Sequence, residues 1–462
     1  MNGLPHRKES YGRHHVSMDA RAFDSAKIIQ AAGDQFIYEE PPPYRLNAFS
    51  MAPDNLPNER LAAQPSRLLR VNHEIVPFTG RDTEIRELIK WRDASNIKTG
   101  VLLVHGAGGQ GKTRFVTHIA RSWENDGWNA YRAVARDDTS GPHAGEMLQA
   151  DADGVLIVAD YADRWCMTDL LSLLRDAAGC VGKVRVLLLA RSAETWWDTL
   201  AYHLDRDLDI DSEKMLLAPL GENPDDRPSL FEDARGEFAR YLRVANSEYI
   251  EPPTRLESDN QYGLILTIHM AALAKVLAHS NREVAPQDSA ELSAFLLARE
   301  RAHWRTLHNR REEPINTAPD IMAQIVYTAT VTGPLAHRHG LEALRCAEVQ
   351  SLHHPGQLLR DHARCYPSGE PGVVLEPLYP DRLGEDFVAL TTPGHRSQQY
   401  RPDPWASDAL QRLLSPAGES DQGSPWTSAA MNLVTEIAAR WPHMASMTRA
   451  GTITSGRHHR RL

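Results

Sequence analysis

The stretch Gly100-Val-Leu-Leu-Val-His-Gly106-Ala-Gly-Gly-Gln-Gly111-Lys112-Thr113 decides the fold, because a short apolar run breaks there into a glycine-rich loop that ends in Lys-Thr. The spacing Gly106-x4-Gly111-Lys112-Thr113 is the Walker A pattern of a P-loop. In such loops backbone N–H groups surround the β-phosphate, the lysine neutralises charge on the β- and γ-phosphates, and the threonine hydroxyl meets Mg²⁺. Glycines suit the loop because a Cβ would hold the backbone away from phosphate. The stretch therefore predicts a phosphate-binding loop.

The segments on both sides of this loop support that interpretation. Val101 to Val104 are apolar and partly β-branched, as expected of a buried parallel strand. Downstream, Phe115, Ile119 and Trp123 recur every four residues and predict a helix that begins at the lysine. Strand, loop and helix N-terminus thus follow in the order that phosphate binding requires. A glycine-rich turn with an incidental lysine is the alternative, and this order argues against it.

Two further apolar segments end in charged residues that suit a nucleotide site. The run from Val155 to Ala159 precedes Asp160, a Walker B arrangement in which the aspartate holds the Mg²⁺ bound to Thr113. The run from Lys183 to Ala190 precedes Arg191. Because parallel strands end at the same edge of a sheet, this arginine could reach a γ-phosphate, and a surface arginine capping a strand is the alternative.

Composition limits the classes of protein to consider. The chain has 462 residues, 42% hydrophobic and 24% charged, which suits about three domains with real cores. The formal net charge of −10 argues against general nucleic-acid or anionic-membrane binding. Four widely spaced cysteines without metal-binding spacing favour reduced core thiols and a cytoplasmic protein. No export signal is visible, and the longest nearly uncharged stretch, Tyr262 to Ala274, is too short to span a membrane.

The pattern along the chain predicts an α/β P-loop NTPase, with a parallel sheet flanked by helices, followed by an all-α lid domain and a winged-helix-like α+β domain. A fifth strand is expected at Met215–Leu220, and His269 is expected to be a core histidine more often than a functional one. The predicted organisation is a mobile N-terminal arm and Pro-rich linker at 1–65, a P-loop nucleotide-binding domain at 66–220, a helical lid domain at 221–315, a winged-helix-like domain at 316–400, and a helical C-terminal segment with a disordered basic tail at 401–462.

Four motifs in this order carry a resemblance to a known family. They are Gly-Ala-Gly-Gly-Gln-Gly-Lys-Thr-Arg-Phe at 106–115, Val-Ala-Asp-Tyr-Ala-Asp at 158–163, Val-Leu-Leu-Leu-Ala-Arg-Ser-Ala-Glu-Thr-Trp-Trp at 186–197, and Pro-Leu-Tyr-Pro-Asp-Arg-Leu-Gly-Glu-Asp-Phe at 377–387. Over roughly residues 66–445 the chain resembles the actinobacterial STAND-type signalling NTPases, relatives of the NB-ARC proteins that commonly carry tetratricopeptide repeats. The resemblance implies an ATP-driven switch that holds ADP when off and forms a homo-oligomer with ATP when on, together with a protein partner or sensor that the sequence does not identify.

The resemblance also implies roles for individual residues. Phe78, Gly80 and Arg81 match the Pro-Phe-x-Gly-Arg element that lies near adenine, Asp160 matches the Walker B acid, and Arg191 matches the first-sensor arginine. The residues expected to contact ATP or ADP are Phe78, Gly80, Arg81, Gly106, Gly108, Gly109, Gln110, Gly111, Lys112, Thr113 and Arg114, those expected to hold Mg²⁺ are Thr113 and Asp160, and those expected to act in catalysis are Lys112, Asp160, Asp163 and Arg191.

Three departures from the family pattern affect the expected activity. Tyr161 stands where fast ATPases of this kind place a water-polarising glutamate, so slow hydrolysis is expected. Asp163 could serve instead, or could form a salt bridge or a cap. The Gly-x-Pro element of the lid is replaced by Gly263-Leu264-Ile265, and no array of repeats of about 34 residues follows.

Three hypotheses follow. The first is an ATP-binding, slowly hydrolysing switch in signalling, regulation or defence. The second is a nucleotide-binding scaffold that never turns over. The third is a DNA-associated AAA-like ATPase, which the net charge of −10 disfavours.

Overall fold

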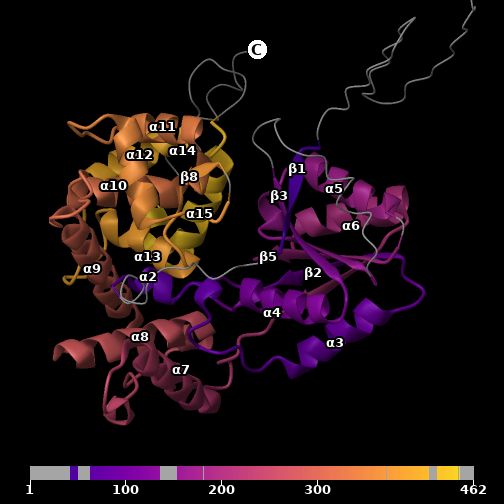
Figure 1. Cartoon of the computed structure of the whole chain (residues 1–462), viewed down its shortest axis with the longest axis horizontal. Coiled ribbons are helices and arrows are strands. Elements are labelled where there is room, and N and C mark those ends of the chain that lie inside the picture. Colours follow the sequence, from indigo (N-terminus) through magenta and orange to yellow (C-terminus); the bar gives the residue numbers. More distant parts are fainter. Residues whose placement is uncertain are drawn as a thin grey trace, which may run out of the picture.

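The computed structural model describes residues 42–49, 63–135, 153–180, 182–370, 372–415, 424–445 and 447. An α/β part built on one sheet lies beside a helical part formed by the later portion of the chain (Figure 1). The basic tail predicted at the C-terminus and the part of the predicted N-terminal arm before residue 42 lie outside the described residues.

One six-stranded sheet forms the centre of the α/β part. In spatial order its strands are β1 (Tyr44–Ala48), β3 (Asn129–Ala135), β4 (Val155–Ala159), β5 (Val184–Ala190), β2 (Thr99–His105) and β6 (Asp211–Leu216). All neighbours are parallel except β1, which runs antiparallel to β3. The carboxyl ends of β2, β4 and β5 therefore meet at one edge, with β5 between the other two.

Helices cover both faces of this sheet, as a parallel sheet requires. Residues of α3 (Asp82–Asp93) and α4 (Lys112–Asn125) share a core with Leu102 and Val104 of β2. Residues of α5 (Met167–Gly179) and α6 (Thr195–Leu208) share a second core with Val101 and Leu103. Alternate residues of the strand that precedes the P-loop thus serve opposite cores, which fixes its register.

Two strands differ from the sequence prediction. The last strand is Asp211–Leu216 and not Met215–Leu220, because an edge strand pairs on one side only and tolerates the exposed polar residues Asp-Ser-Glu-Lys. Its apolar continuation begins with Leu217, which is fully buried and donates its N–H to His105 O at 2.8 Å after the strand has ended. At the other edge, Tyr44–Ala48 falls within the predicted arm and linker and yet pairs with β3.

The helical part shares one continuous hydrophobic core. Its helices are α7 (Arg227–Leu242), α8 (Ile265–Asn281), α9 (Ser289–His308), α10 (Pro319–Thr332), α11 (His337–Cys346), α12 (Pro355–Cys365), α13 (Asp381–Thr391), α14 (Trp405–Leu414) and α15 (Thr427–Arg440), with an antiparallel pair β7 (Leu335–Ala336) and β8 (Val373–Leu375). Short 3₁₀ turns lie at η1 (Val71–His73), η3 (Ala162–Arg164), η4 (Pro224–Asp226), η5 (Ser247–Tyr249), η6 (Asn260–Gly263) and η7 (Pro442–Met444). The predicted fold class, an α/β P-loop fold followed by helices, is confirmed. The comparison of 316–400 with a winged helix stays a prediction.

A short helix between β1 and the other strands of the sheet packs on the helical part. In α2 (Pro65–Leu68) the N–H of Ser66 donates to the buried carboxylate of Glu300 at 2.6 Å, and Arg67 donates to the carbonyl of Cys365 at 2.6 Å. Leu68 belongs to the core of the helical part. From β1 in the sheet, the described chain therefore passes to the helical part at α2, goes back to the sheet, and returns to the helical part after β6.

The described residues bear on two features considered from composition, membrane-spanning helices and the state of the cysteines. No helix there has the length and apolar character needed to cross a bilayer. All four cysteines are free, but Cys166 is exposed and Cys365 is the buried one, so the prediction of core thiols holds fully for Cys365 only.

Candidate nucleotide-binding site

The P-loop connects the end of β2 to the start of α4 in a conformation that needs glycine. Gly106, Gly109 and Gly111 have φ values of 154°, 87° and 86°. A Cβ on Gly106 would lie 2.1 Å from Oε1 of Gln110 and 2.9 Å from the carbonyl oxygen of Leu217. Backbone amides of such a loop, and of the helix N-terminus that follows it, are the groups that bind phosphate oxygens.

Lys112 lies at the mouth of this loop. Its Nζ donates to the carbonyls of Gly106 at 2.7 Å and Ala107 at 3.2 Å. Burial lowers the pKa of the ammonium group, while nearby Asp160 acts in the opposite direction. The structure therefore places the predicted lysine over the loop, where an anion would receive its charge.

Thr113 and Asp160 are brought together, as the Walker A and B assignments require. Thr113 Oγ1 donates to Oδ2 of Asp160 at 3.0 Å, and the N–H of Tyr161 donates to Oδ1 at 2.9 Å. Burial raises the pKa of Asp160. A hydroxyl beside a buried carboxylate supplies two of the oxygen ligands that Mg²⁺ prefers. No cluster of three or more His, Cys, Asp or Glu suited to a metal occurs in the described residues, so phosphate and water oxygens would complete the coordination.

The predicted sensor residues lie beside these groups. The backbone N–H of Arg191 donates to Oδ2 of Asp163 at 3.2 Å. The guanidinium of Arg191 forms ion pairs with Asp381, Glu385 and Glu436. Sequence reasoning assigned no role to these three acids. Asp381 and Glu385 lie inside the fourth family motif, which was a usable signal, whereas nothing in the sequence singles out Glu436.

The element predicted to lie near adenine adjoins the loop. The ring of Phe78 stacks on that of His118 in α4, with ring centroids 4.3 Å apart. Gly80 and Arg81 both have positive φ, and Arg81 donates a 3.4 Å hydrogen bond to the carbonyl of Gln110. The element is therefore joined to the P-loop by side-chain contacts.

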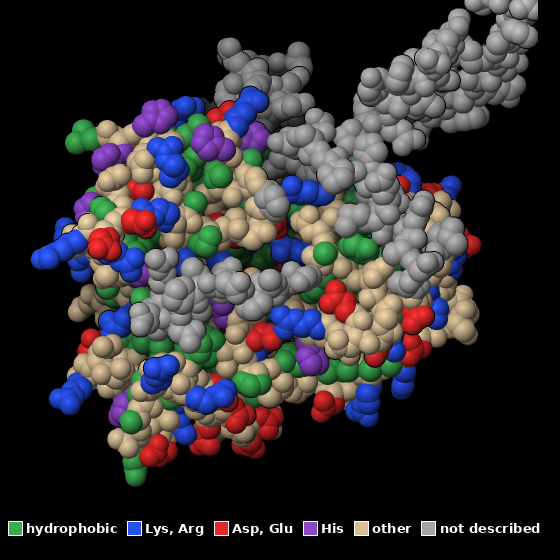
Figure 2. All heavy atoms as spheres, viewed as in Figure 1, with side chains coloured by type: hydrophobic (Ala, Val, Ile, Leu, Met, Phe, Trp, Pro, Cys, Tyr) green, Lys and Arg blue, Asp and Glu red, His purple; other side chains and the backbone are tan. Residues whose placement is uncertain are grey.

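A cavity of about 390 Å³ opens between this element and α7 and α8. Its lining consists of Val76, Pro77, Thr79, Leu230, Glu232, Asp233, Gly236, Glu237, Ile265 and His269. Figure 2 shows acidic side chains gathered at the lower edge of the molecule, where α7 lies. Burial lowers the pKa of His269 to about 3, with a smaller contribution from Arg114, so the imidazole is neutral. His269 thus lines a cavity as well as packing edge-on against Phe238.

The start of α8 closes over the P-loop despite the missing proline. The N–H of Leu266 donates to the carbonyl of Gly109 at 3.1 Å, and a Cβ on Gly109 would lie 3.4 Å from Cβ of Leu266. The segment Gly263–Leu266 therefore contacts the loop through its backbone, and this contact needs no proline.

Several buried polar atoms around the loop have no hydrogen-bond partner within the described residues. They are Oε1 of Gln110, Nε and one terminal nitrogen of Arg114, and Oδ1 of Asp163. Such atoms also occur elsewhere in the described residues, but buried polar groups normally find partners, and those beside the loop are available to a polar ligand. The residues present thus suit a phosphate-bearing nucleotide with Mg²⁺.

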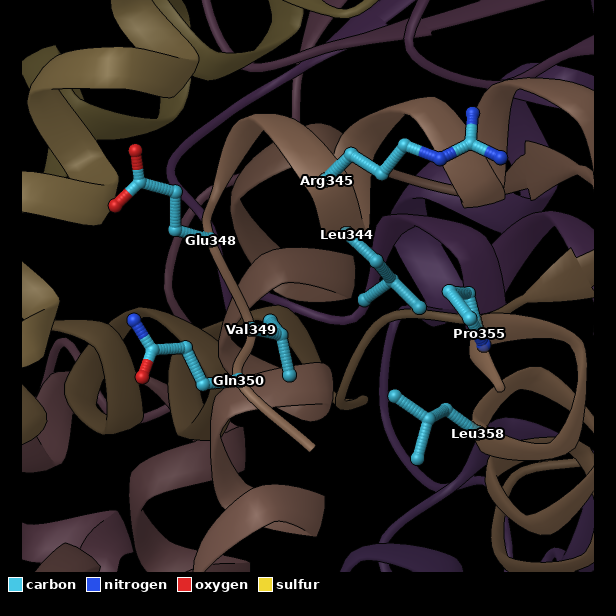
Figure 3. Close-up of a pocket in the computed structure, with 7 residues that line it drawn as sticks. All are labelled: Leu344, Arg345, Glu348, Val349, Gln350, Pro355 and Leu358. Atoms are coloured by element: carbon cyan, nitrogen blue, oxygen red, sulfur yellow. The ribbon is translucent and has the colours of Figure 1, made fainter. Parts of the chain in front are cut away.

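A second cavity lies far along the chain from these residues. It has about 270 Å³ and is formed by α11, α12 and the loop between them. Figure 3 shows Leu344 and Leu358 approaching each other across it, with Glu348 and Gln350 pointing away. No predicted site residue lines this cavity.

Comparisons with known proteins add little to this geometry. No protein-family model and no curated protein sequence matches the chain. Among solved structures, the chain is similar to the ORC2 protein of Aeropyrum pernix in ADPNP–ADP complexes, with 14% identity over 67% of this chain and 93% of that one and a TM-score of 0.35. It is also similar to NtrX of Brucella abortus in complex with ATP (16%, 63% and 69%, 0.33) and to Cdc6p of Pyrobaculum aerophilum (12%, 79% and 96%, 0.30). TM-scores this low support no functional argument. The argument for function therefore rests on the geometry of the site.

Proposed function

We propose that the chain binds Mg²⁺ and ATP or ADP at the P-loop and acts as a slowly hydrolysing molecular switch of the STAND type in the cytoplasm. The observation that carries the proposal is the 3.0 Å hydrogen bond between Thr113 Oγ1 and Asp160 Oδ2 beside Lys112. This hydrogen bond joins the segments that follow β2 and β4. It brings together the ammonium group and the two oxygen ligands that a Mg²⁺-nucleotide needs. The bound Mg²⁺ would neutralise charge on the β- and γ-phosphates.

Different residues of the chain would bind different parts of the nucleotide. Loop amides and Lys112 would bind the phosphates, and Thr113 and Asp160 would hold the metal ion. The cavity of about 390 Å³ beside Thr79 and His269 has a volume suited to a nucleobase and lies next to the Phe78 element. The contact of Leu266 with Gly109 would couple the occupied loop to the helices that follow.

Slow hydrolysis follows from the surroundings of Asp160. The next residue is Tyr161, whose hydroxyl donates to Asp381 at 2.5 Å, so it supplies no base. One oxygen of Asp163 already accepts from Arg191, which leaves only the second oxygen to orient water. A general base must reach the attacking water directly or through one other water.

The non-hydrolysing scaffold is the second candidate, and one observation favours it. The residue after Asp160 is Tyr161, whose hydroxyl already donates to Asp381, so no carboxylate at this position can activate water. A single-turnover measurement with γ-labelled ATP separates the two candidates. Phosphate release that Asp160→Asn abolishes supports the enzyme, and no release from either protein supports the scaffold.

Binding itself is tested by calorimetry with ADP and ATP in Mg²⁺. Lys112→Ala is expected to lower both affinities by at least about 100-fold, since two charge-assisted bonds are lost. Lys90→Ala, an exposed lysine of α3, is the matched control. If Lys112→Ala bound ADP and ATP with wild-type affinity, the assignment of the nucleotide site would be wrong.

A further inference from the structure

The loop between α11 and α12 carries a leucine that no other part of the described chain covers. Leu352 is fully exposed, and it is the most exposed large hydrophobic side chain among the described residues. It lies shortly before the N-terminus of α12. Single exposed hydrophobic residues are common on protein surfaces, so the surroundings of this leucine decide whether it has a role.

Hydrogen bonds order the loop around Leu352. The N–H of His353 donates to Oγ of Ser351 at 3.1 Å, which closes a turn around the leucine. The N–H of Gly356 donates to Nδ1 of His354 at 3.1 Å, which fixes the residues that follow. An ordered turn loses little conformational entropy when a partner binds. Leu352 is therefore presented in a form suited to binding.

An apolar cavity opens beside the same loop. Leu344 and Leu358, both 2% exposed, approach each other across it, and Val349 and Pro355 add to its apolar lining (Figure 3). Its volume is about 270 Å³, which is room for about nine groups of the size of a water molecule and more than a leucine side chain needs. Leu352 is not among the residues that line it. The cavity is thus suited to an aliphatic side chain from another molecule.

Side chains of opposite charge stand at the rim of this cavity. Figure 3 shows Arg345 and Glu348 extending in opposite directions. Arg345 is exposed and forms no ion pair within the described part of the chain. Glu348 is 59% exposed, although its Oε2 lies 3.4 Å from Arg412. A rim with a cation on one side and an anion on the other is complementary to a second copy of itself turned by half a rotation.

A second copy of the chain would cover both the leucine and the cavity. In a symmetric dimer the same patch serves on both sides, so each contact occurs twice. Leu352 of each copy would fill the cavity of the other, and Arg345 of each copy would face Glu348 of the other. A peptide from an unrelated protein could fill the cavity, but it would leave Leu352 exposed. The patch therefore favours a second copy as its occupant.

We propose that two copies of this chain associate through Leu352 and the cavity between α11 and α12, and that this association needs no nucleotide. The inference is independent of the proposed nucleotide site, because no residue predicted to contact nucleotide lines this cavity. A patch of this size is typical of weak, transient contacts, so we expect a dissociation constant in the micromolar range.

Sedimentation velocity on the full chain over a range of concentrations, in EDTA and without nucleotide, tests the proposal. Leu352→Asp is expected to raise the dissociation constant of the dimer at least about 100-fold, because each dimer loses two buried leucines. Val284→Asp changes a 93% exposed valine in the loop between α8 and α9 and is the matched control. It is expected to leave the dissociation constant unchanged.

A charge exchange tests the two-fold arrangement itself. Arg345→Glu and Glu348→Arg are each expected to weaken self-association, since like charges then face each other across the dimer. An equimolar mixture of the two variants is expected to associate again, because every facing pair then joins opposite charges. A general loss of surface adhesion would not be reversed by mixing.

Three results would overturn the proposal. The first is a wild type that stays monomeric at all concentrations, as expected if another protein or a segment outside the described residues filled the cavity. The second is a dimer that Leu352→Asp leaves intact, since its interface would lie elsewhere. The third is a mixture of the two charge variants that fails to associate. Calorimetry with ADP is a separate measurement, so the nucleotide site is judged independently of each result.

Discussion

Replacing Asp160 by Asn is expected to stabilise the protein when no nucleotide is present. The same replacement is expected to reduce the stabilisation that Mg²⁺-nucleotide gives. Burial raises the pKa of this carboxyl, so its charged form is disfavoured in the folded protein. Each pKa unit corresponds to about 1.4 kcal/mol at neutral pH. The penalty sets in as pH rises through the ordinary value of 3.8 and is complete above the raised folded value.

The asparagine keeps both local partners. Its Oδ1 accepts from the Tyr161 N–H, now 2.9 Å from Asp160, and the Thr113 hydroxyl can turn to accept from the amide. Asp160→Asn is therefore expected to stabilise the nucleotide-free protein and to raise its Tm, by about 2–4 °C for each kcal/mol gained in a unit of about 150 residues. Addition of Mg²⁺ with ATP should then stabilise the variant far less than the wild type, because one metal ligand is lost.

Scanning calorimetry at pH 7.5 measures this, in EDTA and in Mg²⁺-ATP. Asp205→Asn, an exposed acid in the last turn of α6, is the control for charge removal. Two results would refute the reasoning. A loss of stability in EDTA would make Asp160 a structural acceptor, and an undiminished Mg²⁺-ATP effect would mean that it holds no metal ion.

Three other predictions follow from single positions. Gly106→Ala should destabilise the protein by about 1–3 kcal/mol and abolish ADP binding, since its Cβ would lie 2.9 Å from the Leu217 carbonyl. Gly179→Ala, with open space around it, should change neither stability nor ADP binding. Urea unfolding measures the first effect and calorimetry the second. Gly236→Leu should fill the cavity and weaken ADP binding but not pyrophosphate binding, while the small Gly236→Ala serves as control, and equal loss for both ligands would contradict a nucleobase there. Burial lowers the pKa of His303 to about 4, so below about pH 6.5 the unfolded chain binds a proton that the folded protein does not bind. The wild type should therefore lose about 2 kcal/mol of stability at this histidine between pH 7.5 and 5, and His303→Gln should not show this loss. An unchanged dependence of stability on pH in urea unfolding would contradict this prediction.

Residues near the P-loop could be predicted because their positions follow from local rules. The glycine spacing fixes the loop, and parallel strands carry Asp160 and Arg191 to the same edge. The structure accordingly brings Thr113 and Asp160 within hydrogen-bond distance.

The partners of Arg191 could not be predicted in the same way. Glu436 lies on α15, and its ion pair with Arg191 depends on how whole helices pack, which no local pattern encodes. The prediction of the two edge strands, β1 and β6, failed for another reason. β1 sits in a proline-rich region, and β6 exposes polar side chains, so neither has the continuous apolar run of a central strand.

The position of α2 has a mechanical consequence. Because β1 pairs with β3 in the sheet while Leu68 of α2 is part of the helical core, the chain crosses between the two parts three times: between β1 and α2, within residues 69–81, and within residues 217–226. Each additional connection removes freedom of relative movement between two bodies. Any separation that starts at the P-loop is therefore restricted by the path of the chain as well as by side-chain contacts.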